Sequence, residues 1–155
     1  MTISDLLAPE HVLLDLRAAD KRQLLGKLAR HLAPTLAIDP EPVAAALVRR
    51  EGLGSTGTGD GIALPHARLT QVARPIGLLA RLRPALDFDA VDGNPVDLVF
   101  LLLLPEGERG AGLNALACVT RRLRKPDVVE ALRRATSREA ACALLTVDQV
   151  CLGNE

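Results

Sequence analysis

The sequence predicts one layered α/β domain, in which helices pack around a single sheet. The chain has 155 residues, of which 48% are hydrophobic, and this is enough to bury a core without disulfides or metal ions. The hydrophobic pattern indicates two helices, then a block of strands, then three helices, with no internal repeat and no long linker. We therefore expect residues 1–155 to form a single domain.

The first third of the chain is expected to contain a strand and two helices. Residues 12–16 are typical of a short strand, and Asp20 then precedes a helix whose leucines at 24, 25, 28 and 32 share one face. Pro34 is expected to end that helix. Aspartate and prolines at 39–42 mark the start of a second helix, which runs directly into a glycine-rich segment.

The rest of the chain is expected to hold the strands and three more helices. Apolar runs at 62–64, 76–82 and 96–104 are bounded by Pro, Gly and Asp, as strands should be. The third run is apolar throughout, so we expect it at the centre of the sheet. The hydrophobic spacing then becomes helical, with interruptions at Pro126 and Ser137 that separate three helices.

Charge and hydropathy exclude several classes of protein. Lys plus Arg and Asp plus Glu number 19 each, so no overall field attracts nucleic acid or an anionic membrane. The longest apolar run, 98–104, is too short to span a bilayer, and the first residues do not resemble a signal peptide. The three cysteines, at 118, 142 and 151, are expected to be small buried side chains in a reducing compartment. We expect a cytoplasmic protein without membrane insertion.

The segment at 50–66, REGLGSTGTGDGIALPH, is the most informative part of the chain, because it presents one histidine from a glycine-rich loop. Its letters GLGSTG match the dinucleotide-binding fingerprint, which requires a strand before it and a helix after it. The preceding residues are helical, and the glycines and proline that follow rule out a helix, so we reject that reading. A P-loop is excluded as well, because no Gly-Lys-Ser/Thr follows.

His66 is the candidate reactive residue. The unprotonated nitrogen of an imidazole can attack a phosphorus atom or bind a metal. The ordinary alternative is a turn histidine that caps backbone groups. The surroundings favour a phosphorylated imidazole, because glycine N–H groups come close and several oxyanion-binding side chains are near in sequence: Arg50, Ser55, Thr56 and Arg68.

Other kinds of site have weaker support. His11 and His31 show no spacing that indicates a metal site, and we expect none. The basic concentration at 121–138 is interrupted by acidic residues and contains no aromatic residue, so a solvated helical face is favoured over a nucleic-acid site, while a protein-docking face stays open. A Cys/His pair or a Ser/His/Asp triad also stays open, because such partners meet in space rather than along the chain.

Two motifs, GSTG at 54–57 and GIALPH at 61–66, resemble the active-site segment of a known family. This family is the fructose/mannitol-type (type 2) enzyme IIA domains of the bacterial phosphotransferase system, and the chain is most similar to its nitrogen-regulatory branch. The resemblance spans roughly residues 6–146 and continues through FDAVD at 88–92 and PVDL at 95–98. It implies a three-layer sandwich, with a mixed sheet flanked by helices.

The resemblance also implies a phosphocarrier that needs no metal or organic cofactor. His66 would accept phosphate from a phosphorylated HPr-type carrier, with Arg50 beside the phosphate. The other residues expected to stabilise the phosphate are Ser55, Thr56, Gly57 and Arg68. The phosphate would pass to an enzyme IIB, or regulatory target proteins would read the phosphorylation state as a nitrogen or metabolic signal. We expect no attached IIB, IIC or carrier domain, and together with the nitrogen-type resemblance this favours regulation over transport.

One position departs from the family pattern. Many members carry a second histidine at the start of the helix after the last core strand, and alignment on Leu113 and Leu116 places Gly112 there. Loss of a hydrogen bond to a charged group, worth about 1.5 to 3 kcal/mol, would weaken the phosphorylated form roughly ten- to hundredfold. Backbone N–H groups of that helix, Asn114 or an arginine are candidates to replace it. The alternative function is an IIA-like interaction module that is phosphorylated weakly or not at all.

Overall fold

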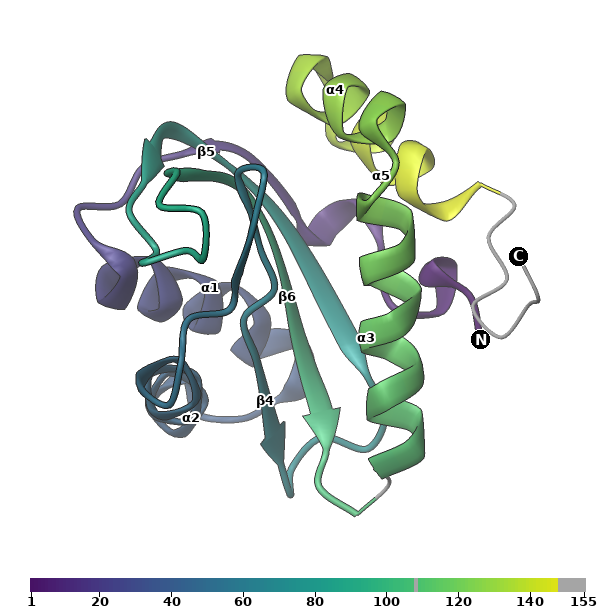
Figure 1. Cartoon of the computed structure of the whole chain (residues 1–155). Helices are drawn as coiled ribbons and strands as arrows, with labels where there is room; N and C mark the ends of the chain where they lie inside the picture. Colours follow the sequence, from purple (N-terminus) through teal and green to yellow (C-terminus); the bar gives the residue numbers. More distant parts are fainter. Residues whose placement is uncertain (108, 148–155) are drawn as a thin grey trace.

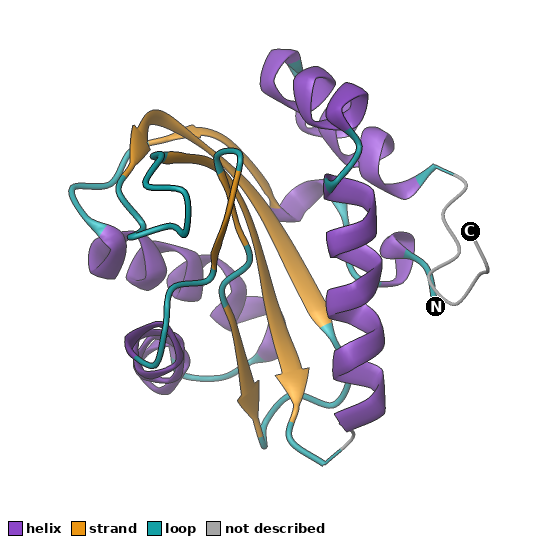
Figure 2. Ribbon diagram, viewed as in Figure 1, coloured by secondary structure: helices purple, strands orange, loops and turns teal. Residues whose placement is uncertain are grey.

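The structure is a computed structural model that describes residues 1–107 and 109–147 (Figure 1). Its strands form one mixed sheet with helices on both faces (Figure 2). The expected fold class, a mixed sheet flanked by helices, is confirmed. In chain order the strands are β1 (Val12–Leu16), β2 (Gly57–Gly59), β3 (Ile62–Ala63), β4 (His66–Leu69), β5 (Ile76–Leu86) and β6 (Val96–Pro105).

Strand β6 is the centre of the sheet and is buried on both faces. It pairs antiparallel with β5 and parallel with β3 and β4, while β1 pairs parallel with β5 at one edge and β2 pairs antiparallel with β3 at the other. Its side chains alternate between two hydrophobic cores, with Leu98 and Phe100 in one and Val99 and Leu101 in the other. The prediction that the apolar run at 96–104 is central is confirmed.

The helices form two layers, one on each core. On one face lie α1 (Lys21–Leu36) and α2 (Pro40–Gly52); on the other lie α3 (Arg109–Leu123), α4 (Pro126–Arg134), α5 (Arg138–Thr146) and two short 3-10 turns, Ile3–Asp5 and Pro9–His11 (Figure 1). The side chains of Asp20 and Asp39 cap α1 and α2 by accepting hydrogen bonds from backbone N–H groups. All of the helices expected from the hydrophobic pattern are present.

The prediction that Pro34 ends the first helix was wrong by two residues. Proline removes only the hydrogen bond that its own nitrogen would donate, and α1 continues through its last turn to Leu36. The helix ends instead at Ala37, which has a left-handed backbone (φ 55°) and donates to carbonyls of that turn.

The glycine-rich segment is more ordered than the sequence predicts. His66 was expected in a loop, but it is the first residue of β4, and Gly57–Gly59 forms β2. Neither segment has a run of β-branched or aromatic residues, so local propensity gave no strand signal. Pairing with the central strand β6 overrides that weak propensity for β4.

The cysteines agree only in part with expectation. Cys118 and Cys142 are buried, and Cys142 is a free thiol. Cys118 is disulfide-bonded, which the expectation of reduced thiols did not include. Cys151 lies outside the described residues. Within those residues, no helix combines the length and the apolarity needed to cross a bilayer.

A buried arginine of the sheet is hydrogen-bonded to the carboxyl end of α4. Arg81, on β5, donates to the carbonyl oxygens of Leu132 and Ala135 at 2.9 and 2.7 Å, and its Nε donates to a carboxylate oxygen of Asp15 at 3.0 Å. The charged group is satisfied by carbonyls that the helix end leaves free. Its neighbour Arg83 also pairs with Asp15, at 3.4 Å, but its side chain is exposed.

We expect Arg81→Met to lower the free energy of unfolding by about 2 to 4 kcal/mol, because buried carbonyls lose their donor. The matched change Arg83→Met removes only an exposed ion pair and should cost less than about 1 kcal/mol. Urea denaturation of both variants tests this, and equal losses would contradict the assigned role of Arg81.

Candidate functional site

His66 is held by the backbone of the central strand. In the parallel β4–β6 pairing it lies opposite Leu102, whose N–H donates to the carbonyl of Pro65 at 3.0 Å. The side chains of His66 and Arg68 are half-buried and those of Ala67 and Leu69 are buried, so the strand alternates. His66 and Arg68 therefore share the face of β4 that is turned away from α1 and α2.

The imidazole of His66 has one nitrogen engaged by the backbone. Nδ1 lies 2.9 Å from the carbonyl oxygen of Leu64. A carbonyl can only accept a hydrogen bond, so Nδ1 carries the proton and donates it. In the neutral ring Nε2 is then the unprotonated nitrogen, the one with a lone pair for nucleophilic attack.

The surroundings keep this ring neutral. Burial lowers the pKa of His66 below its ordinary value, and the positive charges of Arg50 and Arg68 lower it further. The hydrogen bond to Leu64 and the charge of Glu51 oppose this, but the net pKa is lowered. The ring is thus available as a nucleophile at neutral pH.

Arg50 approaches the site from the carboxyl end of α2. Its Nη1 donates to the carbonyl of Gly54 at 2.8 Å, and its charge acts on His66. This bond folds the arginine back over the segment that follows its own helix. Arg50 is therefore one of the positive charges that act on the His66 ring.

Ser55 and Thr56, expected to stabilise phosphate, have their hydroxyl groups occupied by protein. The Ser55 hydroxyl donates to the carbonyl of Phe88 and accepts from the N–H of Gly57. Thr56 is buried, and its hydroxyl donates to Glu51 Oε1 at 2.6 Å, while its N–H donates to Oε2 at 2.9 Å. These contacts shape the segment before His66.

Glu51 and Lys21 are site residues that sequence reasoning missed. The ammonium group of Lys21 lies 3.1 Å from Glu51 Oε2 and donates to the Phe88 carbonyl at 3.0 Å. Glu51 is therefore a buried carboxylate with three donors, which makes its burial tolerable. Nothing in the sequence signals this, because Lys21 is 30 positions away.

Gly57 is required by packing. An added Cβ would lie 2.9 Å from the Cβ of Ala90, which is closer than two such atoms approach. Its N–H donates to Ser55. The glycine thus admits the segment that follows β5, a role different from the phosphate contact expected of it.

Arg68 lies against the first turns of α3. An added Cβ at Gly112 would lie 3.0 Å from Arg68 Nη1 and 3.2 Å from Nη2, so the guanidinium fills the space beside this glycine. Nη1 is buried and has no hydrogen-bond partner among residues 1–107 and 109–147. The space that a side chain at position 112 would enter is therefore filled by an arginine of β4.

His11 and His31 lie apart from this site and contact each other. Their rings meet edge to face, with centroids 5.4 Å apart. His31 Nε2 lies 2.9 Å from the carbonyl oxygen of Glu10. The described part of the chain contains no group of three or more His, Cys, Asp or Glu side chains that could hold a metal ion.

The amino-acid sequence at 5–147 matches the family described as phosphoenolpyruvate-dependent sugar phosphotransferase system, EIIA 2. The chain belongs to this type-2 enzyme IIA family. A nitrogen regulatory protein of Bradyrhizobium diazoefficiens is 42% identical over 95% of the chain and 96% of its own length. A nitrogen regulatory protein of Pseudomonas aeruginosa is 39% identical over 89% and 90%.

Solved structures agree with this enzyme IIA assignment. The nitrogen regulatory protein IIA-Ntr from Neisseria meningitidis superimposes with a TM-score of 0.88 and 35% identity, over 93% of this chain and 99% of that one. IIA mannitol from Escherichia coli superimposes with a TM-score of 0.75 over 90% and 99%, at 24% identity, and so supports the fold alone. The resemblance read from the two glycine motifs is confirmed.

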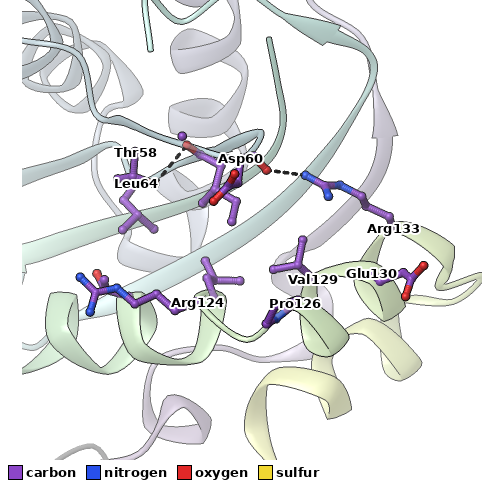
Figure 3. A pocket seen from close by; sticks show the side chains of 12 residues that line it. Thr58, Asp60, Leu64, Arg124, Pro126, Val129, Glu130 and Arg133 are labelled. Atoms are coloured by element: carbon purple, nitrogen blue, oxygen red, sulfur yellow. Dashed lines mark hydrogen bonds between the residues drawn. The ribbon is translucent and has the colours of Figure 1, made fainter. Parts of the chain in front are cut away.

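This enzyme IIA domain contains a cavity of about 680 Å³ that is lined by Leu64 but not by His66. It lies between the β2–β3 turn and the adjoining ends of α3 and α4 (Figure 3). Leu64 and Val129 form apolar walls, and at the rim Arg133 Nη2 donates to the carbonyl of Asp60 at 2.7 Å. Leu64 thus both lines the cavity and orients the imidazole of His66.

We expect the ring of His66 to titrate below pH 6.5, the ordinary histidine value, because burial and two arginines disfavour its charged form. Arg50→Gln should raise the midpoint, since one positive charge is lost. NMR titration of the ring protons measures both, with Arg49→Gln, an exposed arginine next in sequence, as the control that leaves the midpoint unchanged. A wild-type midpoint at or above 6.5 would refute the expectation.

Thr56→Val should destabilise the segment before His66, because Glu51 Oε1 loses its donor in a buried place at a cost of about 1 to 3 kcal/mol. Thr58→Val, at an exposed threonine two residues on, should change stability by less than about 0.5 kcal/mol. Urea denaturation compares the two variants, and amide exchange of residue 56 reports the local effect. Similar stability of both variants would show that the Thr56 hydroxyl contributes little.

Proposed function

We propose that this enzyme IIA domain is a phosphocarrier and regulatory protein, in which Nε2 of His66 accepts a phosphoryl group from a phosphorylated HPr-type carrier. The observation that carries the proposal is the hydrogen bond from Nδ1 to Leu64, which leaves Nε2 as the nucleophile of a ring kept neutral by its surroundings. The step needs no metal or organic cofactor, because donor and acceptor are both histidines.

In the proposed reaction, the Nε2 lone pair of His66 forms a bond to phosphorus while the nitrogen–phosphorus bond of the donor breaks. The bonding electrons return to the ring of the donor. Because the bond that forms and the bond that breaks are both between phosphorus and a histidine nitrogen, the exchange is close to thermoneutral. The Nδ1 proton stays between His66 and the carbonyl of Leu64, and this carbonyl dipole stabilises the positive charge that the imidazole gains.

Charges around His66 support an anionic adduct. Arg50 and Arg68 both act electrostatically on the ring, so a phosphoryl group bonded to it would enter a positive potential. The hydroxyl groups of Ser55 and Thr56 are engaged elsewhere. We therefore assign charge compensation to the two arginines.

A regulatory role is favoured by the similarity of the chain to nitrogen regulatory proteins. Two relatives at 42% and 39% identity are nitrogen regulatory proteins, and a mannitol IIA protein forms a complex with phosphorylated IIB. Two exposed leucines lie close in sequence to site residues: Leu53, three residues after Arg50, is 83% exposed, and Leu113, next to Gly112, is 62% exposed. We propose that partners dock over these leucines and read the charge on His66 as a nitrogen or metabolic signal in the cytoplasm.

The alternative is an interaction module that is phosphorylated weakly or not at all. Gly112 is the observation that favours it, since this residue offers no side chain to the phosphate. Arg68 beside Gly112 favours the phosphocarrier instead. Labelling separates the two.

Incubation with labelled phosphoenolpyruvate, enzyme I and an HPr-type carrier should give one acid-labile adduct per chain. His66→Ala should abolish it, because the nucleophile is gone, and His31→Ala should retain it. Mass spectrometry assigns the site, and circular dichroism checks that both variants fold.

Two results would overturn the proposal. One is an unlabelled wild type when a known enzyme IIA protein is labelled in parallel, which leaves the interaction module. The other is label that persists in His66→Ala, which would place the phosphate on another residue.

A further inference from the structure

Arg68 is an unusual arginine, because Nη1 of its charged group is buried and has no hydrogen-bond acceptor among the described residues. A buried donor on a charged group is costly to leave unpaired, whereas a hydrogen bond from it to an anion is strong. An arginine in this state is therefore prepared for an anionic acceptor.

The place of Arg68 points to which anion that is. Arg68 is two residues after His66 on the same strand, so both side chains leave the same face of β4. The guanidinium is close enough to lower the pKa of the imidazole. A phosphoryl group on His66 would bring three acceptor oxygens to this face.

The place of Arg68 depends on a glycine in α3. A Cβ at Gly112 would come within 3.0 Å of Nη1, 3.2 Å of Nη2 and 3.3 Å of a methyl group of Leu104. A Cβ at position 112 would therefore require the guanidinium to shift by a few tenths of an ångström. Gly112 thus creates the space, although helix interiors disfavour glycine by about 1 kcal/mol relative to alanine.

We propose that Arg68 and Gly112 form one phosphate-binding unit, in which the glycine admits the guanidinium and Nη1 of Arg68 donates to a phosphoryl oxygen on His66. This inference rests on the proposed phosphocarrier function and adds the atom that binds the phosphate. It also accounts for the departure at position 112: a donor from β4 takes the place of a side chain from α3.

The test compares four variants with the wild type. Arg68→Gln removes the charge, and Arg68→Lys keeps the charge but loses the planar fork. Gly112→Ala shifts the guanidinium slightly and leaves residue 68 an arginine. Gly110→Ala is the matched control, because it adds the same methyl group to the same helix with nothing within 4 Å.

The main measurement is the equilibrium of phosphate transfer between each variant and the HPr-type carrier. Arg68→Gln should shift it against the phosphorylated form by roughly ten- to hundredfold, the effect of one charged hydrogen bond. Arg68→Lys and Gly112→Ala should fall between this variant and the wild type. Gly110→Ala should match the wild type.

A second measurement needs no phosphate. In the unphosphorylated protein, Arg68→Gln should raise the NMR titration midpoint of the His66 ring, because a neighbouring positive charge is lost. A merely structural role for Arg68 would change thermal stability and leave this midpoint unchanged. Thermal unfolding of every variant is recorded alongside.

The outcomes separate this inference from the proposed function. If the wild type is labelled and Arg68→Gln transfers phosphate with the wild-type equilibrium, the Arg68–Gly112 unit is refuted and the phosphocarrier stands. If Gly112→Ala and Gly110→Ala behave alike, the role of the glycine is refuted. If the wild type takes no label, the proposed function and this inference fall together.

Discussion

The geometry of the site depends on the buried carboxylate of Glu51. This group lies in the last turn of α2, accepts two hydrogen bonds from Thr56 and pairs with Lys21, whose ammonium also donates to the carbonyl of Phe88. It joins α1, α2, the glycine-rich segment and the chain after β5 at one point. A carboxylate is costly to bury unless several donors surround it. Displacement of any one of these segments would therefore leave the charge of Glu51 without one of its donors and destabilise the others.

Three hydrogen bonds connect this anchor to the reactive ring. Thr56 is bound to Glu51, the N–H of Leu64 donates to the carbonyl of Thr56 at 3.0 Å, and the carbonyl of Leu64 accepts the Nδ1 proton of His66. The orientation of the imidazole therefore depends on a charge pair at the far end of the glycine segment. Such supporting contacts keep a side chain in one orientation.

Sequence reasoning was strongest for long periodic elements and for the two glycine motifs that indicated the family. The helices and the central strand followed from hydrophobic spacing, because one buried face repeats over many residues. β4 was missed because four residues, HARL, carry little propensity and depend on pairing with β6. Glu51 and Lys21 were missed because their contact spans 30 positions. The contact between Arg68 and Gly112 could not be predicted either, because a glycine carries no sequence signal of which side chain fills the space beside it.

The pairing of β4 with β6 bears on how a partner would distinguish the phosphorylated form of the proposed function from the unphosphorylated one. His66 is paired with the most buried strand, so the phosphoryl group of the proposed function would change the surface mainly in charge and hardly in shape. Recognition would then be electrostatic, and mobile ions weaken such discrimination when charges are exposed. The ionic strength of the medium, rather than any movement of the backbone, would then set how sharply a partner separates one form from the other.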